Sequence, residues 1–306
     1  MTALDDLVAA GALRAMASIA ALTTYKLGGP ARYFLEAENE TQLVSIGGAL
    51  GDEPLLVLGR GSNLIVSDDG FPGLVVHLGS GFIGTELGEQ GRVTSGAATS
   101  MPALARTCAR ASRSGLEFFI GIPGSVGGGV RMNAGCHGSE TRDWLHSARV
   151  VELRSGAVSD RKPDELNMTY RHTNLQSDEI VTSATFVTEP GDGEAIAETM
   201  RDISRWRRDH QPGGTLNAGS VFKNPSDGAA GRIIDSLGLK GTRIGGAHVS
   251  TKHANFFVAD EGVKAQDVYD LVWRIRRRVG VELGIWLQPE VEFAGPFRRS
   301  PDEDAQ

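Results

Sequence analysis

Short runs of apolar and β-branched residues recur through the first two-thirds of the chain, and each ends at glycine or at polar residues. Runs of this length and composition, with these boundaries, predict β-strands rather than helices. The predicted strands cover residues 33–37, 55–58, 64–66, 74–78, 92–95, 149–153 and 180–187, with one more at 255–259.

Helical spacing of apolar residues is found in several other segments. Leu104, Cys108 and Ala111 recur at helical intervals, and Gly115 then supplies a stop signal. The apolar stripe near the C-terminus leaves the arginines at 276–278 to one side, so we interpret them as a solvated helix face. The predicted helices cover residues 101–114, 191–210, 229–237 and 265–279, with a short surface helix at 4–17.

The predicted strands and helices do not alternate in a regular βαβ order. This pattern is typical of an α+β fold with segregated units. We expect a first unit at residues 1–79, joined by a returning C-terminal strand at 284–295, a second unit at 80–205 and a third at 206–283. The polar end of the chain, residues 296–306, is predicted to be a disordered tail.

Composition and charge exclude several classes of protein. Of the 306 residues, 40% are hydrophobic and 23% are charged, as in an ordinary soluble protein. The net charge of −7 argues against nucleic-acid binding, because phosphate contacts need a basic surface. The apolar run at 15–22 is too short to insert into a membrane, and acidic Asp5 and Asp6 argue against a signal peptide. Two cysteines indicate neither a disulfide framework nor a four-cysteine zinc site, so we expect a cytoplasmic protein without a metal.

Glycine is the unusual component of the chain. It provides 40 of the 306 residues, about twice the usual frequency of ~7%. The glycines cluster in the sequence GRGSN at 59–63 and again over residues 121–138. Such clusters predict backbone with positive φ, or backbone pressed against a ligand, whose N–H groups form anion-binding nests. Because Leu64 stands where G-x-G-x-x-G needs its last glycine, we expect a dinucleotide held without a Rossmann helix terminus.

Three polar positions could carry chemistry, and each also has an ordinary structural interpretation. Arg171 is either a fixed cation or part of a surface turn. Ser220 is either a functional hydroxyl at a tight turn or a plain loop serine, and the neighbouring Lys223 and Asn224 would suit a phosphate. Glu290 either points inward, by strand alternation, or lies solvated on an edge strand.

The motifs occur in the order of a known family and span nearly the whole chain. As they stand in this sequence, they are TTYKLGGP at 23–30, GRGSN at 59–63, the loop at 121–138, YR at 170–171, AGSVFKNP at 218–225, GLKG at 238–241, VSTKHANF at 249–256 and LQPEV at 287–291. Together they resemble the MurB family, the flavoprotein UDP-N-acetylenolpyruvoylglucosamine reductases. The glycine loops alone would indicate only the wider vanillyl-alcohol-oxidase (PCMH-type) FAD-binding fold.

The resemblance implies that this FAD-binding fold carries an added α+β substrate-binding domain. Units 1–79 and 80–205 would then be the FAD-binding subdomains, and 206–283 would bind substrate. The implied enzyme is an oxidoreductase with noncovalent FAD that uses NADPH to reduce UDP-N-acetylglucosamine enolpyruvate to UDP-N-acetylmuramate. That reaction serves peptidoglycan synthesis, and through it cell shape and division. Its partners would be these small molecules, and the chain would be a monomer or a weak dimer.

The match to the family motifs also implies residue roles. Hydride would come from flavin N5 and a proton from Ser220, while Arg171 holds the developing negative charge and Glu290 assists the enolate-like intermediate. The residues matched to FAD-binding positions are Gly59, Arg60, Gly61, Ser62, Asn63, Pro123, Gly124, Ser125, Gly127, Gly128, Asn133 and Gly135. The residues matched to substrate-binding positions are Tyr170, Lys223, Asn224 and His210.

Two departures from the family pattern change these expectations. His210 stands where the family usually has a lysine at the substrate phosphates. Because histidine ordinarily titrates near pH 6.5, the diphosphate affinity would be weaker or pH-dependent. The segment between Arg171 and Gly219 leaves no room for the extra tyrosine-bearing loop of the longer subclass, so the chain resembles the shorter, type II form.

Two other functions stay open on the sequence. One is an FAD-dependent oxidase or dehydrogenase of the same fold that acts on an alcohol or sugar. The other is a catalytically silent flavoprotein that binds a UDP-sugar. The Ser220 and Glu290 segments count against the first, and the presence of Arg171, Ser220 and Glu290 together counts against the second. NADPH oxidation that depends on the enolpyruvyl substrate would separate all three functions.

Overall fold

The computed structural model describes residues 2–303 and divides into two compact units. Unit 1 consists of Met1–Ala15, Tyr33–Arg60 and Gly73–Arg207. Unit 2 consists of Met16–Arg32, Gly61–Pro72 and Arg208–Gln306. Neither unit is a continuous stretch of sequence, because the chain passes from one to the other several times.

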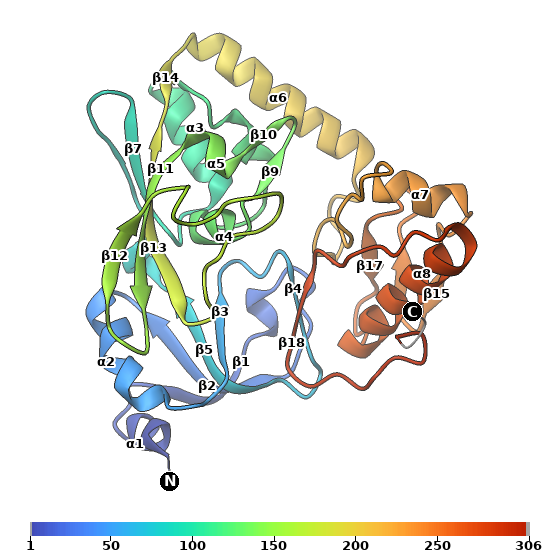
Figure 1. Ribbon diagram of the computed structural model, residues 1–306, viewed down its shortest axis with the longest axis horizontal. Helices are drawn as coiled ribbons and strands as arrows, with labels where there is room; N and C mark the ends of the chain where they lie inside the picture. Colours follow the sequence, from blue (N-terminus) through green and yellow to red (C-terminus); the bar gives the residue numbers. More distant parts are fainter. Residues whose placement is uncertain (1, 304–306) are drawn as a thin grey trace. The chain divides into compact units, whose positions relative to one another are not determined.

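The larger sheet of unit 1 is antiparallel, with the strand order β12-β11-β13-β7-β6 (Figure 1). Its strands are β6 (Thr85–Leu87), β7 (Arg92–Gly96), β11 (Leu145–Glu152), β12 (Val158–Arg161) and β13 (Glu179–Val187). Two short pairs accompany it, β8 (Arg113–Ser114) with β14 (Glu189–Pro190) and β9 (Gly135–Cys136) with β10 (Ser139–Glu140). Val93, Val150 and Phe186 of the sheet pack with Leu104 and Phe119 in one buried core.

A second sheet has the order β1-β2-β5-β3. Its strands are β1 (Arg14–Ser18), β2 (Pro30–Ala37), β3 (Leu55–Leu58) and β5 (Phe71–Leu78). Within unit 1, Leu35 and Leu74 of this sheet share a buried core with Leu4 and Leu43 of the first two helices. The helices before Gly191 are α1 (Ala3–Ala9), α2 (Glu40–Leu50), α3 (Met101–Arg110), α4 (Val126–Arg131) and α5 (Thr141–Trp144), with short 3-10 turns η1 (Ala20–Leu22), η2 (Ser80–Phe82) and η3 (Glu117–Gly121).

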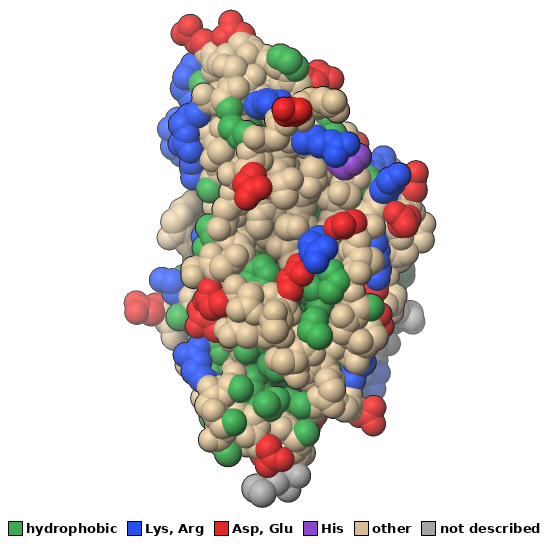
Figure 2. All heavy atoms as spheres, turned by 90° about the vertical axis from the view of Figure 1, so that its left-hand side faces the viewer, with side chains coloured by type: hydrophobic (Ala, Val, Ile, Leu, Met, Phe, Trp, Pro, Cys, Tyr) green, Lys and Arg blue, Asp and Glu red, His purple; other side chains and the backbone are tan. Residues whose placement is uncertain are grey.

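Charged side chains are mixed over the surface. On the face drawn in Figure 2, acidic and basic side chains are both spread across the molecule. Among the described residues, no helix is long and apolar enough to cross a membrane.

Unit 2 is built around one long helix. The unit also contains a three-stranded antiparallel sheet and one pair of parallel strands. Its elements are β4 (Leu64–Val66) and, after α6 (Gly193–His210), α7 (Ala230–Ser236), β15 (Arg243–Ile244), β16 (Ala247–Val249), β17 (Phe257–Ala259), α8 (Ala265–Leu283) and β18 (Glu292–Ala294). Helix α8 begins where the Asp68 carboxylate accepts the N–H groups of Ala265 (2.9 Å) and Gln266 (3.1 Å). This carboxylate satisfies two helix N–H groups that would otherwise lack a partner.

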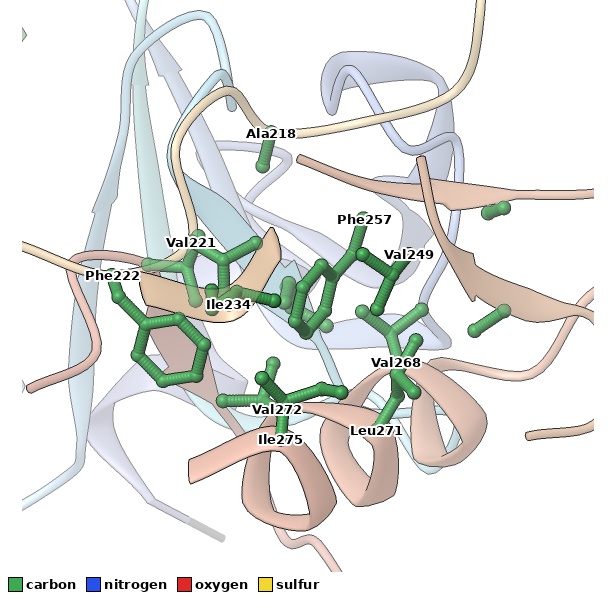
Figure 3. Packing of buried hydrophobic residues seen from close by; sticks show 14 of the residues in the cluster. Ala218, Val221, Phe222, Ile234, Val249, Phe257, Val268, Leu271, Val272 and Ile275 are labelled. Atoms are coloured by element: carbon green, nitrogen blue, oxygen red, sulfur yellow. The ribbon is translucent and has the colours of Figure 1, made fainter. Parts of the chain in front are cut away.

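The apolar stripe of α8 forms the core of unit 2. Figure 3 shows Val268, Val272 and Ile275 pointing from the helix toward Phe257 and Val221. All five side chains are completely buried. Burial of one such side chain contributes about 1.5–3 kcal/mol, so this stripe is a main source of the stability of unit 2.

Most of the strands and helices predicted from the sequence are present, although the helix predicted at 101–114 ends at Arg110 and several short elements, such as β6 and β12, were not predicted. Two further differences have a physical reason. The N-terminal helix predicted at 4–17 is wrong beyond Ala9, because Gly11 adopts a φ of 76° and the chain then forms β1. Helix α2 was not predicted, because Gly47 lies in its middle and glycine usually interrupts helices. A Cβ on Gly47 would lie on the Leu153 carbonyl oxygen, at 1.6 Å. The glycine is therefore present for close packing.

The prediction of a disordered tail is wrong for residues 296–303. The Phe297 ring stacks on Tyr269 with ring centroids 4.7 Å apart. The Asp302 carboxylate binds Arg277 at 2.8 Å and also accepts a hydrogen bond from Arg274. The tail therefore packs on α8, and only residues 304–306 of the predicted disordered segment lie outside the described residues.

The predicted division into three units stays a prediction. The contacts group the chain into two units. Residues 61–72 belong to the same unit as the C-terminal part of the chain. The returning C-terminal strand is present as β18, which pairs with β4 in that unit.

The tail contact generates a stability prediction. Burial alone would raise the pKa of Asp302, but hydrogen bonds from Arg274 and Arg277 outweigh it and lower that pKa below its usual value. A carboxyl with a lowered pKa stabilises the fold above the unfolded pKa of about 4, and this stabilisation is lost as the pH falls through the folded pKa. We expect Asp302→Asn to reduce the free energy of unfolding by about 1–2 kcal/mol at pH 7.

Urea unfolding at pH 7 and pH 3 measures this effect. The difference between Asp302→Asn and the wild type should shrink at pH 3. Glu261→Gln is the control, because Glu261 is an exposed carboxylate in the same unit. An equal loss in both variants, or a loss that does not change with pH, would contradict the prediction.

Candidate functional site

The glycine-rich stretch at 121–138 contains a short helix rather than only open turns. Helix α4 starts after Ser125 and spans Val126–Arg131. Of the seven glycines in this stretch, only Gly138 has a positive φ, at 83°. Positive φ therefore applies to one of these glycines, and for the other six the alternative, backbone pressed against a ligand, stays a prediction.

Close packing explains the glycines of this helix. A Cβ on Gly127 would lie 3.0 Å from the Cβ of Ala97, and a Cβ on Gly129 would lie 2.7 Å from the Cε of Met101. Both distances are shorter than an ordinary contact between carbon atoms. The glycines allow α4 to approach its neighbours in unit 1.

The predicted anion nest is partly used within the protein. At the start of α4, the N–H groups of Val126 and Gly127 donate to the carbonyls of Thr99 and Ala97, both at 2.9 Å. Because each N–H has one strong bond, these two are not available to a ligand in this arrangement. A cofactor would instead be bound by the residues before the helix and by the neighbouring loop.

Parts of the two predicted cofactor loops lie side by side in unit 1. A Cβ on Gly59 would come within 2.7 Å of the Ser125 Oγ. The Arg60 Nε donates to the Pro123 carbonyl at 3.3 Å. Small residues and backbone therefore line the place where the loops meet, which fits the close approach that a dinucleotide phosphate requires. The residues here that could hold FAD are Gly59, Arg60, Pro123, Gly124, Ser125 and Gly128.

The rest of the GRGSN turn belongs to unit 2. Gly61 has a φ of 56°, and a Cβ there would lie 2.5 Å from the Cα of Thr23. The Thr24 N–H donates to the Gly61 carbonyl at 3.1 Å. The TTYKLGGP motif therefore supports the turn, and Gly61 is required both for its conformation and for space.

Asn63, at the end of the same turn, supports a second candidate segment. Its Nδ2 donates to the Glu290 carbonyl at 2.9 Å, and its own carbonyl accepts the Glu292 N–H at 2.9 Å. Ser62 is half-buried beside it. The structure thus joins a predicted cofactor residue to the backbone of a predicted catalytic residue.

Ser220 enters an extended segment that one asparagine holds in place. Gly219 before it has a φ of 75°, and its N–H donates to Asn217 Oδ1 at 3.0 Å. Two residues after the serine, the Phe222 N–H donates to Asn255 Oδ1 (2.9 Å) and the Phe222 carbonyl accepts from Asn255 Nδ2 (2.8 Å). Asn255 is only 3% exposed. Ser220 is therefore on backbone that hydrogen bonds hold in place rather than in a loose loop.

Glu290 lies on backbone that runs beside the Ser220 segment. The Glu290 N–H donates to the Val221 carbonyl at 2.7 Å, and the Lys223 N–H donates to the Gln288 carbonyl at 2.9 Å. Val221 directly follows Ser220, so the structure brings the serine and glutamate segments together in unit 2. Arg171, in contrast, belongs to unit 1.

Arg171 lies at the tip of a tight turn. The N–H and carbonyl groups of Thr169 and His172 bond each other at 3.0 and 3.1 Å. Arg171 has a φ of 54°, a strained conformation for a residue other than glycine that costs of order 1–3 kcal/mol. Its Nη2 donates to the Gly135 carbonyl at 2.6 Å, and its guanidinium lies 5.0 Å from the ring centroid of Tyr170. The cation is thus held on two sides.

Two of the predicted substrate-binding residues of unit 2 lie at helix ends. The Asn224 Oδ1 accepts the Ala230 N–H at 3.0 Å, which places this side chain at the start of α7. His210 is exposed at the end of α6. Burial lowers the pKa of His253, and the charges of Lys240 and His210 lower it further. The Asp235 carboxylate, which pairs with Lys240 at 2.7 Å, acts in the opposite direction.

Cys136, which lies in the glycine-rich stretch, is not prepared for a covalent link to a flavin. Its thiol donates to the Phe118 carbonyl at 3.2 Å. Burial raises the pKa of Cys136 to about 11, although Arg207 and Arg171 act in the opposite direction. The thiol is consequently protonated at neutral pH. Within residues 2–303, no group of three or more His, Cys, Asp or Glu side chains could hold a metal ion.

Two asparagines have structural roles that the sequence did not predict. They are Asn255 and Asn133. Asn255 was quoted only within a motif, although a polar residue between apolar ones in a predicted strand was a signal. Asn133 was predicted to bind FAD, but it is completely buried. Its Nδ2 donates to the Thr169 carbonyl and its Oδ1 accepts the Arg142 N–H, both at 2.9 Å. This geometry does not support a side-chain contact between Asn133 and FAD.

Comparison with known proteins identifies the family. A family model described as UDP-N-acetylenolpyruvoylglucosamine reductase, C-terminal domain, matches residues 211–294, and one described as FAD binding domain matches residues 31–160. The UDP-N-acetylenolpyruvoylglucosamine reductase of Parasynechococcus marenigrum (strain WH8102) is 43% identical over 289 residues, which are 93% of this chain and 96% of that protein. The chain belongs to the UDP-N-acetylenolpyruvoylglucosamine reductase family.

Other members of the family agree with this assignment. The reductase of Gloeobacter violaceus is 42% identical over 283 residues, covering 91% of this chain and 95% of the relative. The crystal structure of the reductase (MurB) from Thermus caldophilus has a TM-score of 0.80 and 37% identity, and it covers 92% of this chain and 100% of that chain. The protein is thus an FAD-containing oxidoreductase with the predicted FAD-binding fold and an added C-terminal domain.

The Asn255 contacts generate a prediction about this C-terminal domain. Asn255→Ala would leave the buried N–H and carbonyl of Phe222 without partners, so we expect a loss of about 2–3 kcal/mol in the free energy of unfolding. Asn255→Asp keeps the acceptor but turns a negative oxygen toward the Phe222 carbonyl in a buried place, so its loss at pH 7 should be at least as large. Urea unfolding measures both losses. A loss below about 0.5 kcal/mol for Asn255→Ala would show that other groups hold the strand.

Proposed function

We propose that the protein reduces UDP-N-acetylglucosamine enolpyruvate to UDP-N-acetylmuramate with NADPH, in a cytoplasmic step of peptidoglycan synthesis. The pairing of the Ser220 and Glu290 segments carries this proposal, because the Val221 carbonyl accepts the Glu290 N–H at 2.7 Å inside the matched C-terminal domain. The relative from Parasynechococcus marenigrum has the corresponding reductase name and aligns with 93% of this chain.

The reaction adds a hydride and a proton across the enolpyruvyl double bond. FAD, when bound, supplies the hydride after its own reduction by NADPH. Negative charge then develops beside the substrate carboxylate, where it needs a fixed cation and a proton donor. The chain's own residues therefore have three tasks: to bind the sugar nucleotide, to stabilise this charge and to deliver the proton.

We assign the charge-stabilising task to Arg171. Its guanidinium donates to the Gly135 carbonyl at 2.6 Å and lies over the Tyr170 ring. A cation that is already oriented need not reorganise as charge develops, and such preorganised groups contribute most to the stabilisation of a transition state. Tyr170, 46% exposed, is then the neighbour that contacts substrate.

We assign proton delivery to Ser220, with Glu290 assisting the enolate-like intermediate. A serine hydroxyl is a weak acid, so it protonates only a strong base, and a carbon with carbanion character is such a base. The bonds from Asn255 to Phe222 and from Val221 to Glu290 keep this hydroxyl on fixed backbone. A positioned acid of this kind typically contributes a factor of about 10²–10⁴ to the rate.

The sugar diphosphate would be bound by Lys223, Asn224 and His210. Asn224 is oriented by the start of α7, and the charge of His210 contributes to the depressed pKa of His253. Positively charged and amide groups of these types suit a diphosphate, because their N–H groups donate charge-assisted hydrogen bonds to its oxygens.

Anaerobic stopped-flow measurement of the flavin absorbance tests the proposed reaction. NADPH should bleach the flavin, and UDP-N-acetylglucosamine enolpyruvate should then restore its absorbance. Bleaching without recovery would indicate an oxidase or dehydrogenase with another substrate. A protein that binds the UDP-sugar but does not oxidise NADPH would be a noncatalytic flavoprotein.

The assignment of Ser220 predicts a specific variant phenotype. Ser220→Ala should slow product formation by roughly 10²–10⁴-fold, because the proton donor is lost. Reduction of the flavin by NADPH should continue at the wild-type rate. The control is Ser236→Ala, which removes an exposed hydroxyl of α7 that donates to the Ile233 carbonyl at 2.8 Å. Product formation by Ser220→Ala at the rate of this control would remove the serine from the mechanism.

His210 predicts pH-dependent substrate affinity. A histidine that gains a proton attracts the diphosphate more strongly, so the dissociation constant of the UDP-sugar should rise by roughly five-fold, or ~1 kcal/mol, between pH 6 and pH 8. His210→Lys keeps its charge across this range and should give a flat profile. Calorimetric titration of the oxidised holoenzyme measures both profiles. A flat profile in the wild type would separate His210 from diphosphate binding.

A further inference from the structure

Asn133 stands out among the polar residues of unit 1. It is completely buried, and its φ of 41° lies in the left-handed region that asparagine tolerates better than most residues. Its side chain is bonded at both ends, from Nδ2 to the Thr169 carbonyl and from the Arg142 N–H to Oδ1, each at 2.9 Å. Its burial, its left-handed backbone and its two hydrogen bonds together restrict the side chains that this position can accept.

The contacts of Asn133 lead to the turn that carries Arg171. The Thr169 carbonyl accepts the hydrogen bond from the Asn133 amide, and Thr169 is the first residue of this turn. Across the turn, Thr169 forms two backbone hydrogen bonds with His172. The guanidinium of Arg171 also returns to this segment, with Nη1 3.5 Å from the Asn133 carbonyl and Nη2 2.6 Å from the Gly135 carbonyl. The segment therefore holds both the backbone of the turn and the cation at its tip.

We propose that Asn133 is a positioning residue for Arg171 and sets the direction of its guanidinium for the reaction. This inference rests on the proposed function, because it takes Arg171 as the group that stabilises charge on the substrate. Asn133 acts through the turn and does not touch substrate.

The amide is chemically suited to this position. One end must donate to the Thr169 carbonyl while the other accepts the Arg142 N–H, and an asparagine amide does both without charge. Aspartate keeps the acceptor but places a negative oxygen against a carbonyl oxygen. Alanine removes both bonds, so the Thr169 carbonyl keeps only the His172 N–H and the Arg142 N–H loses its acceptor, and alanine also adopts a positive φ poorly. Each substitution should release the turn while leaving the rest of unit 1 in place.

The test compares Asn133→Asp and Asn133→Gly with a matched control. Glycine keeps the left-handed backbone without the amide, so it serves if the aspartate variant does not fold. Thr141→Val is the control, because it removes a buried hydrogen bond from the Thr141 hydroxyl to the Ala134 carbonyl, 2.8 Å long, beside the same segment. For each holoenzyme, FAD content, flavin reduction by NADPH and reoxidation by the enolpyruvyl substrate are measured separately.

We expect the Asn133 variants to slow reoxidation roughly 10- to 100-fold, since misplacement of a catalytic group by about 1 Å has effects of this size. Flavin reduction should change far less, and Thr141→Val should reoxidise at the wild-type rate. In the Arg171→Ala background, Asn133→Asp should cause no further loss, because the group that it positions is already gone.

Three results would overturn the inference. Additive losses in the double variant would mean that Asn133 acts independently of Arg171. Loss of FAD from both Asn133 variants but not from Thr141→Val would return Asn133 to cofactor binding. Reoxidation at the wild-type rate by Arg171→Ala would refute the role assigned to Arg171 in the proposed function. The first two results would refute only the positioning role of Asn133.

Discussion

The segments that carry the candidate chemistry are irregular backbone, and their polar main-chain groups must find partners. A buried N–H or carbonyl without a partner costs about 1–3 kcal/mol. Three asparagine side chains supply these partners, because a neutral amide both donates and accepts. The bonds run from Asn63 to the Glu290 carbonyl, from Asn133 to the Thr169 carbonyl and between Asn255 and both groups of Phe222. The serine, glutamate and arginine segments all depend on this support.

In the segments described here, glycine is needed more because a side chain would not fit than because of its conformational freedom. In α4, Gly127 and Gly129 have ordinary helical backbone, and a Cβ at either position would meet a neighbouring side chain. Gly59 likewise allows one loop to approach Ser125 in the other. Gly219 is different, since its φ is 75° and nothing lies near its missing Cβ. High glycine content thus has two separate causes, which the composition alone does not distinguish.

The sequence-based predictions were accurate where they depended on nearby residues and failed where they depended on residues distant in the sequence. The apolar stripe of α8 was predicted because its spacing is visible within a few turns of helix. Helix α2 and the contact between the tail and α8 were missed, because both depend on residues distant in the sequence. Gly47 packs against the Leu153 carbonyl, and Asp302 binds Arg274 and Arg277. Local pattern shows that a residue is polar or small, but it does not show which distant group it meets.

The sequence by itself determined the family, through motifs spread over nearly the whole chain, and with it the FAD-binding fold and the catalytic candidates. It also determined the principal strands and helices, since alternation and helical spacing are local properties. Only the tertiary structure decided that the Ser220 and Glu290 segments share hydrogen bonds and that the Asn133 amide faces the Arg171 turn. The physical reason is that a hydrogen-bond partner far along the chain is chosen by the folded backbone, whereas burial and periodicity are properties of each segment alone.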